Sequence, residues 1–206
     1  MDAWPASAKI VTETITPVVS TFVDRTQSGF RSARSGERHF WQMRILTKLV
    51  SRENKTGVMG WQSLVAFLDK QRGRFNPFTF ISTTQTHPLG AITGTPAVLG
   101  ATLTGARQVV VDGWGASLTQ LKSGDFFKFA NHLKVYRAVL DCVSDGAGQS
   151  TLTFEPALVA DVADNELLTV DSVPFTMALS VDSYDCAISV EGWTQFDLSL
   201  EEVWNV

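Results

Sequence analysis

The chain has 206 residues, of which 44% are hydrophobic and 18% charged, so it is long enough for one large or two small cores and is not disordered throughout. It has no apolar run long enough to span a bilayer, and its first residues lack the basic flank and apolar stretch of a signal peptide, so we expect a soluble, unprocessed chain. Two cysteines, Cys142 and Cys186, argue against a disulfide-stapled scaffold and against a zinc site built from cysteines alone.

The net charge of −4 hides a strong asymmetry along the chain. Residues 1–74 hold 12 of the 17 bases and 6 of the 21 acids, whereas residues 173–206 hold six acids and no Lys or Arg. The two ends of the chain are therefore electrostatic complements. They could neutralise each other within one folded unit or meet across a subunit boundary, where charge matching fixes register and partner choice.

The first clear element is an alternating segment over residues 39–50, which is typical of a half-buried strand. The apolar face carries His39, Trp41, Met43, Ile45, Thr47 and Leu49. The opposite face includes Gln42, Arg44 and Lys48, so the strand is predicted to have a basic, solvent-exposed side.

A helix is predicted next, because four apolar residues recur at the i, i+3, i+4, i+7 spacing of a single stripe. These residues are Trp61, Leu64, Val65 and Leu68. We expect Thr56 as the N-cap and Gly73 as the stop signal.

The composition changes after a short predicted strand at 78–82, where residues 84–106 become rich in Thr, Gly and Pro. Five or six short strands follow at close intervals and predict a small barrel or sandwich. From Val173 three alternating segments with acidic outer faces could pair with the basic 39–50 strand in one antiparallel sheet. We therefore predict a discontinuous domain of residues 1–83 and 173–206, interrupted by an inserted barrel at 84–172.

Catalytic and ligand-binding motifs are missing from the sequence. His39, His87 and His132 stand in no metal-ligand spacing, and there is no HExxH, Walker loop or GxSxG elbow. The acidic residues of segment 161–171 do not match a calcium-binding loop. We expect no catalytic residue, no metal and no cofactor.

Nucleic-acid binding is disfavoured by the charge of the insertion, which holds five bases and nine acids. Its aromatic residues Phe126, Phe127, Phe129 and Tyr136 are expected to fill the barrel core rather than to stack bases.

Carbohydrate binding by the barrel is the alternative that the sequence keeps open. Trp114 lies between Gly113 and Gly115, in a turn where packing would not obviously bury it, and exposed Trp or Tyr rings can stack on sugars. Trp114 and Tyr136 are the candidate glycan or fibre contacts. The competing interpretation is that Trp114 caps a barrel end or lies at an interface.

Large apolar residues near the chain ends suggest an assembly surface. Trp4 and Trp204 would be solvent-exposed in a monomer, and the N-terminal arm also carries Val18, Val19 and Phe22. Frayed termini are the simpler alternative. Combined with the charged strand faces, the predicted assembly residues are Trp4, Phe22, Arg44, Lys48, Glu191, Asp197, Glu201 and Trp204.

The order of these elements resembles the distal tail proteins of long, flexible-tailed bacteriophages. The likeness is carried by the insertion segment 124-GDFFKFANHLKVYR-137 and the closing segment 196-FDLSLEEVW-204. It implies a mainly β (α+β) fold with a discontinuous, β-sandwich-like ring domain containing one helix, and an inserted barrel of the oligonucleotide/oligosaccharide-binding (OB) type. Such proteins form a hexameric ring below the tail tube protein and above the central hub.

By this resemblance the chain is a non-enzymatic virion protein of the tail tip, made in the host cytoplasm. Its implied partners are copies of itself, the tail tube protein, the hub or baseplate protein, and fibre, collar or tape-measure proteins, with no specific nucleic acid and no membrane. The discontinuous domain would form the ring, with its basic and acidic flanks meeting between neighbours, and the barrel would project outward.

Overall fold

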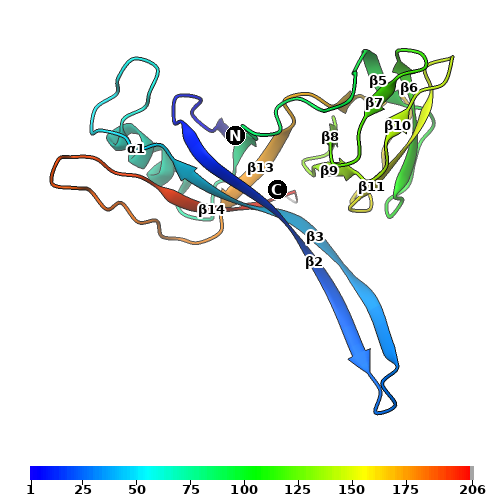
Figure 1. Cartoon of the computed structure of the whole chain (residues 1–206), viewed down its shortest axis with the longest axis horizontal. Coiled ribbons are helices and arrows are strands. Elements are labelled where there is room, and N and C mark those ends of the chain that lie inside the picture. The colour runs from blue at the N-terminus through cyan, green and yellow to red at the C-terminus, as the bar shows by residue number, and fades with distance from the viewer. Residues whose placement is uncertain (205–206) are drawn as a thin grey trace. The chain divides into compact units, whose positions relative to one another are not determined.

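The computed structural model describes residues 1–204, which form fourteen strands and one helix, so the chain is mainly β (Figure 1). The chain divides into two compact units, and both are discontinuous. The first comprises residues 1–4 and 77–177 together with Val203 and Trp204; the second comprises residues 5–76 and 178–202. The strand at 78–81 thus belongs to the same unit as the barrel, and the unit boundaries differ by several residues from those expected at 83/84 and 172/173.

The second unit is built on three antiparallel strands in the order β14-β3-β2. These are β2 (Ile10–Arg25), β3 (Arg31–Thr47) and β14 (Asp197–Glu202). Trp41, Met43 and Ile45 are buried on one face of β3, whereas Gln42 and Arg44 are exposed on the other. The predicted alternation is therefore confirmed from Trp41 to Thr47, where β3 ends, but Leu49, expected on the apolar face, is 53% exposed.

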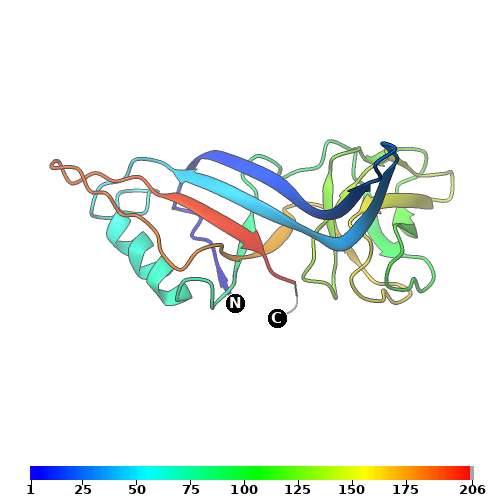
Figure 2. The ribbon, with the colours of Figure 1, turned by 90° about the horizontal axis from the view of Figure 1, so that it is seen from below.

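Strand β3 begins at Arg31, eight residues before the predicted start at His39. Together with β2 it forms a long hairpin, and β14 pairs with β3 only between Gln42 and Leu46. The hairpin extends well past the short strand β14 in two views of the molecule (Figures 1 and 2). Sequence periodicity missed this half of the hairpin because it has no apolar face.

A glycine and a bulge lie at the point where the hairpin leaves the core. The pairing register shifts between Val19 and Thr21, and Gly36 lies opposite this shift. A Cβ added at Gly36 would come within 2.4 Å of the Ser20 hydroxyl oxygen and 2.8 Å of its Cβ. The strands can therefore approach this closely only because position 36 lacks a side chain.

Helix α1 (Trp61–Gln71) buries Leu64 and Leu68, as the predicted stripe requires. Its N-cap is Gly60, so the prediction of Thr56 is wrong. Lys55 and Val58 exchange backbone hydrogen bonds around Thr56, which holds that residue in a separate tight turn. At the other end Gly73 takes a left-handed conformation (φ 64°) just past the helix, in agreement with the predicted stop.

In the first unit, three strands precede and follow the barrel in sequence. They are β1 (Asp2–Ala3), β4 (Phe78–Ile81) and β13 (Pro174–Leu179). β1 pairs with β4 in parallel, and β13 pairs with β4 antiparallel. The ring of Trp4 lies 6.0 Å from those of both Phe78 and Phe80, so the first residues are held by aromatic packing.

The barrel is a sheet of six strands in the order β12-β8-β9-β11-β6-β5. The strands are β5 (Gly94–Val98), β6 (Gln108–Trp114), β8 (Phe126–Phe129), β9 (Tyr136–Ala138), β11 (Ser150–Glu155) and β12 (Leu168–Thr169). A bridge between Ala97 and Leu167 nearly closes the sheet on itself. A separate ribbon pairs β7 (Thr119–Leu121) with β10 (Cys142–Val143). The six-stranded sheet has one strand more than the five-stranded OB barrel implied by the resemblance.

Aromatic side chains fill the barrel, as expected from the sequence. The rings of Phe127, Phe129, Tyr136 and Phe154 are fully buried, and neighbouring ring centroids lie 5.4–6.1 Å apart. Most pairs meet edge to face, which is a favourable arrangement for aromatic quadrupoles. The prediction of a barrel core rather than a base-stacking platform is confirmed for Phe127, Phe129 and Tyr136. Phe126 is also buried, but it packs on Phe175 of β13 instead of joining that core.

Replacing Gly36 by Ala should loosen the outer half of the hairpin without unfolding the molecule. The added Cβ would displace Ser20, and amides of residues 20–38 should exchange with deuterium faster than in the wild type. The free energy of unfolding should change by less than about 0.5 kcal/mol, since this half is not packed on the core. Combining Gly36→Ala with Ser20→Gly should restore the protection, and unchanged exchange in the single variant would refute the steric account.

Candidate functional site

The outer half of the β2–β3 hairpin, residues 20–38, is here called the arm. Every residue from Thr21 to Ser35 is exposed, so both faces of the two-stranded ribbon are in water. Phe22 and Phe30 are 55% and 71% exposed. Two-stranded hairpins are marginally stable in water unless they pack on something. An arm of this length with exposed aromatic side chains is therefore a surface suited to a partner.

The tip of the arm places two arginines directly opposite each other. Arg25 of β2 pairs in register with Arg31 of β3, on either side of the turn at 26–30. Among the described side chains, which exclude that of Glu37, neither arginine has an ion pair, whereas Arg34 lies over the ring of Phe22 at 5.7 Å. Like charges directly opposite across strands destabilise a hairpin, so the tip favours a negatively charged neighbour.

The predicted meeting of basic and acidic strands occurs within the chain. Arg44 of β3 forms a two-pronged ion pair with Asp197 of β14; its Nε donates to Oδ1 at 2.8 Å, and its Nη2 donates to Oδ2. The hydrogen bond from Arg44 holds the pKa of Asp197 below its ordinary value. These two predicted assembly residues therefore neutralise each other at the surface of the same sheet.

The other predicted assembly residues differ in their exposure to solvent. Lys48 and Glu191 are exposed, and Glu201 is half-buried at the end of β14. The expectation that Trp4 and Trp204 would be left in water is wrong. Trp4 packs on the phenylalanines of β4, and the Lys134 ammonium lies 4.3 Å from the ring centroid of Trp204, so both indoles are half-buried within the first unit.

The two candidate glycan contacts are both buried. Trp114 is 5% exposed and Tyr136 is fully buried, so neither ring can stack on a sugar in this structure. The Tyr136 hydroxyl lies 2.7 Å from Nδ1 of His132 and accepts a hydrogen bond from the Val159 amide. The expectation that packing leaves Trp114 exposed is therefore wrong.

Glycines account for the burial of Trp114. Gly113 has φ 76°, and a Cβ there would lie 2.3 Å from the carbonyl oxygen of Thr95 in the neighbouring strand β5. A Cβ at Gly148 would lie 2.2 Å from the carbonyl oxygen of Trp114. The glycines mark close strand contacts rather than an open turn, and these contacts turn the indole into the barrel.

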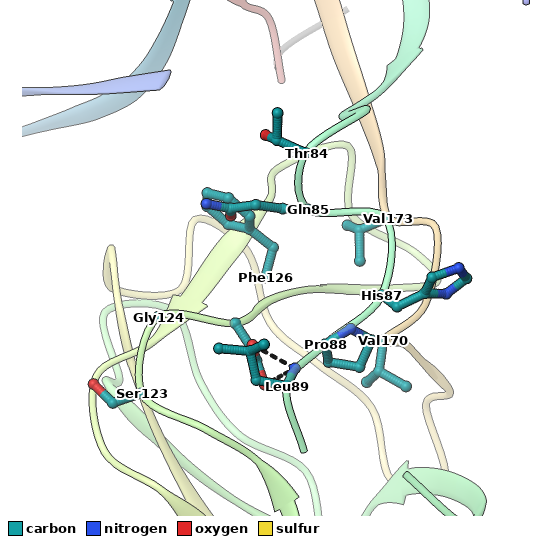
Figure 3. Close-up of a pocket in the computed structure, with 11 residues that line it drawn as sticks. Thr84, Gln85, His87, Pro88, Leu89, Ser123, Gly124, Phe126, Val170 and Val173 are labelled. Atoms are coloured by element: carbon teal, nitrogen blue, oxygen red, sulfur yellow. Dashed lines mark hydrogen bonds between the residues drawn. The ribbon is translucent and has the colours of Figure 1, made fainter. Parts of the chain in front are cut away.

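A pocket of about 320 Å³ lies beside the barrel in the first unit (Figure 3). Its wall includes Gln85, His87, Leu89, Phe126 and Val170. His87 Nδ1 lies 2.5 Å from Asp171 Oδ1 at the surface, where the pair joins the two segments that enter and leave the barrel. The pocket lining mixes apolar side chains with the polar side chains of Thr84, Gln85, His87, Ser123 and Asp125.

Asp125 at the floor of this pocket has a structural role. Its carboxylate accepts hydrogen bonds from the backbone N–H groups of Leu89, Gly90 and Lys122 at 2.7–3.4 Å, and its side chain is buried. Its acceptor sites are thus directed at the backbone, which fixes the segment that enters the barrel.

Sequence reasoning named Phe22 in the arm but missed Phe30, Arg25 and Arg31. It predicted no strand before His39, although β2 and the first part of β3 lie there. The available signal was the Ser28-Gly29 dipeptide, which is typical of a turn. Gly29 has φ 80°, and Thr26 Oγ1 accepts a hydrogen bond from the Phe30 amide across this turn.

The ion pair of β3 and β14 predicts a loss of stability in acid. The pKa of Asp197 is lowered on folding. The ion pair therefore stabilises the folded chain fully above the ordinary pKa of 3.8, and this stabilisation is lost as the pH falls through the pKa of the folded state. Arg44→Gln should return the NMR titration midpoint of Asp197 toward 3.8, and Arg52→Gln should leave it in place. A midpoint unaffected by Arg44→Gln would contradict the assignment.

Asp125→Ala should destabilise the first unit by about 2–4 kcal/mol, because N–H groups that meet the carboxylate would lose their acceptor. Urea denaturation would measure the change. Asp112→Ala serves as the control; that residue lies in β6, its carboxylate accepts no hydrogen bond from the described residues, and the substitution should cost less than about 1 kcal/mol. Equal losses of stability in the two variants would show that the hydrogen bonds of Asp125 to the backbone do not stabilise the first unit.

Several classes of function find no support in the described part of the chain. Within it, no three His, Cys, Asp or Glu side chains are grouped to hold a metal ion, and no helix is long and apolar enough to cross a membrane. The proposals below therefore rest on the arm and the charged surfaces. In comparisons with known proteins, no family model matches the sequence and no curated protein matches it.

Proposed function

We propose that the chain is a structural protein of a phage tail tip that assembles with copies of itself into a ring. The observation that carries this proposal is the arm, whose two faces are exposed from Thr21 to Ser35 and whose aromatic residues and arginines lie in water. A ribbon without a core of its own gains stability when a neighbour covers it. Self-assembly supplies that neighbour at every copy.

The fold supports a scaffolding role more than a chemical one. The chain is mainly β, and a nearly closed barrel is inserted between strands β4 and β13. The arrangement that we propose is a β-sandwich-like ring domain built on residues 5–76 and 178–202, with an OB-like barrel projecting from it. The additional strand of the barrel sheet is a departure from the OB pattern.

In this role the ring joins the tail tube protein to the hub or baseplate, and the barrel supports fibres or a collar in the virion. A hexamer is the proposed ring order, and the tape-measure protein is a further proposed neighbour. We propose no enzymatic activity, no metal or cofactor, and no specific nucleic-acid or membrane ligand. The glycan-binding alternative is less favoured, because Trp114 and Tyr136 are buried.

Native mass spectrometry and negative-stain electron microscopy of the purified chain test the ring. We expect a closed assembly of six copies with a central opening, and binding to a tail tube protein at one face. Because part of the contact would be electrostatic, raising the salt concentration should shift the assembly toward monomers. A chain that stays monomeric at high concentration, alone and with tail proteins, would refute the proposal.

A further inference from the structure

The second unit carries both a positively charged arm tip and a groove beside strand β14 that could receive it. We propose that the arm tip of one copy docks in the acidic, partly apolar groove beside strand β14 of the next copy. This inference rests on the proposed ring and identifies its contact surfaces. It commits to a second copy of the chain as the occupant of that groove.

The tip offers two positive charges beside an apolar pair on one ribbon face. Arg25 and Arg31 are directly opposite each other, and two positions away on the same face Val23 pairs with Ala33. Val23 is 44% exposed, and the described chain provides no ion pair for either arginine. Two guanidinium groups this close favour a carboxylate-bearing surface, because a shared anion removes their mutual repulsion.

The complementary groove lies in the same unit. The segment between β13 and β14, residues 180–196, contains acids and no Lys or Arg. Asp185 of this segment lines two adjoining hollows of about 210 and 300 Å³ beside β14. The larger hollow is also lined by Arg44 and Asp197, which form an ion pair with each other, so Asp185 supplies the unpaired negative charge. Within residues 1–204 the Asp185 carboxylate has no hydrogen bond or ion pair, whereas the nearby Asp197 is neutralised by Arg44.

The groove also supplies apolar surface next to the charge. The smaller hollow is lined by Leu179, Val181 and Leu198 together with Asp185; Val181, which is 51% exposed, supplies its apolar surface, since both leucines are buried. Val23 and Ala33 of the tip can cover these residues while the arginines reach the carboxylate. The match of apolar with apolar and of positive with negative distinguishes this groove from the pocket near Trp193, whose lining includes Lys48 and Lys55 and would repel the tip.

The two surfaces lie at opposite ends of the second unit, as Figures 1 and 2 show for the arm tip and the 180–196 segment. The arm tip of one copy therefore cannot dock in the groove of the same copy. A contact between different patches of successive copies is heterologous, and when its rotation closes it produces a ring.

Charge reversal on the full-length chain tests the pairing. Arg25→Glu/Arg31→Glu should weaken self-association at least about tenfold by analytical ultracentrifugation, and Asp185→Arg, which reverses the unpaired charge of the groove, should do the same. The control Lys9→Glu/Arg52→Glu makes the same change of charge away from both surfaces and should assemble like the wild type. Circular dichroism would verify that each variant is folded.

A mixture of the two reversed variants gives the decisive readout. Each variant repels itself, but the tip of either one matches the groove of the other, so the mixture should rebuild assemblies that contain equal numbers of both. Failure of the wild type to form rings would refute the proposed function. Rings that persist in the reversed variants, or a mixture that stays dissociated, would refute this docking while leaving the ring intact. Binding of DNA that depends on Arg25 and Arg31, with self-association unchanged, would overturn it in favour of a nucleic-acid partner.

Discussion

The backbone ladder between β2 and β3 extends far beyond the hydrophobic core that supports it. Near Trp41 and Ile45 the hairpin has a buried face, and β14 adds a third strand. Beyond Gly36 the same ladder continues with water on both sides. Hydrogen bonds alone give a ribbon little net stability, because the unfolded chain makes similar bonds to water. This imbalance is the basis of the proposed assembly role, in which the surface of a second copy supplies the missing core.

Some charged side chains form ion pairs within the described part of the chain, and others do not. Arg44 and Asp197 join neighbouring strands and neutralise each other. Arg25, Arg31 and Asp185 remain without partners among residues 1–204. The first pair fixes the register of a sheet, whereas the remaining charges are available for recognition. An electrostatic contact of this kind contributes more to orientation and specificity than to affinity.

The barrel differs from the arm, because its aromatic and polar side chains are buried. Tyr136, His132 and Trp114 are buried, and the Asp125 carboxylate is engaged by backbone amides. Such a module is stiff and presents few reactive groups. A stiff insertion is well suited to projecting from an assembly as a spacer or support.

The sequence by itself determined the elements that have one solvent-exposed face and one buried face. The alternation around Met43, the stripe of Leu64 and Leu68, and the aromatic barrel core could be read directly, because periodic burial leaves a periodic pattern. The opposite signs of the chain ends also predicted that β3 and β14 carry complementary charges.

Only the tertiary structure decided the features that have no periodic signature. The arm is invisible to pattern analysis because both of its faces are exposed, so nothing alternates between Thr21 and Ser35. The burial of Trp114 depends on Gly113 of β6 and on Gly148 in the turn before β11, which come close to their neighbours only in the folded barrel. The opposition of Arg25 and Arg31 likewise depends on strand register, which the turn geometry sets and composition does not reveal.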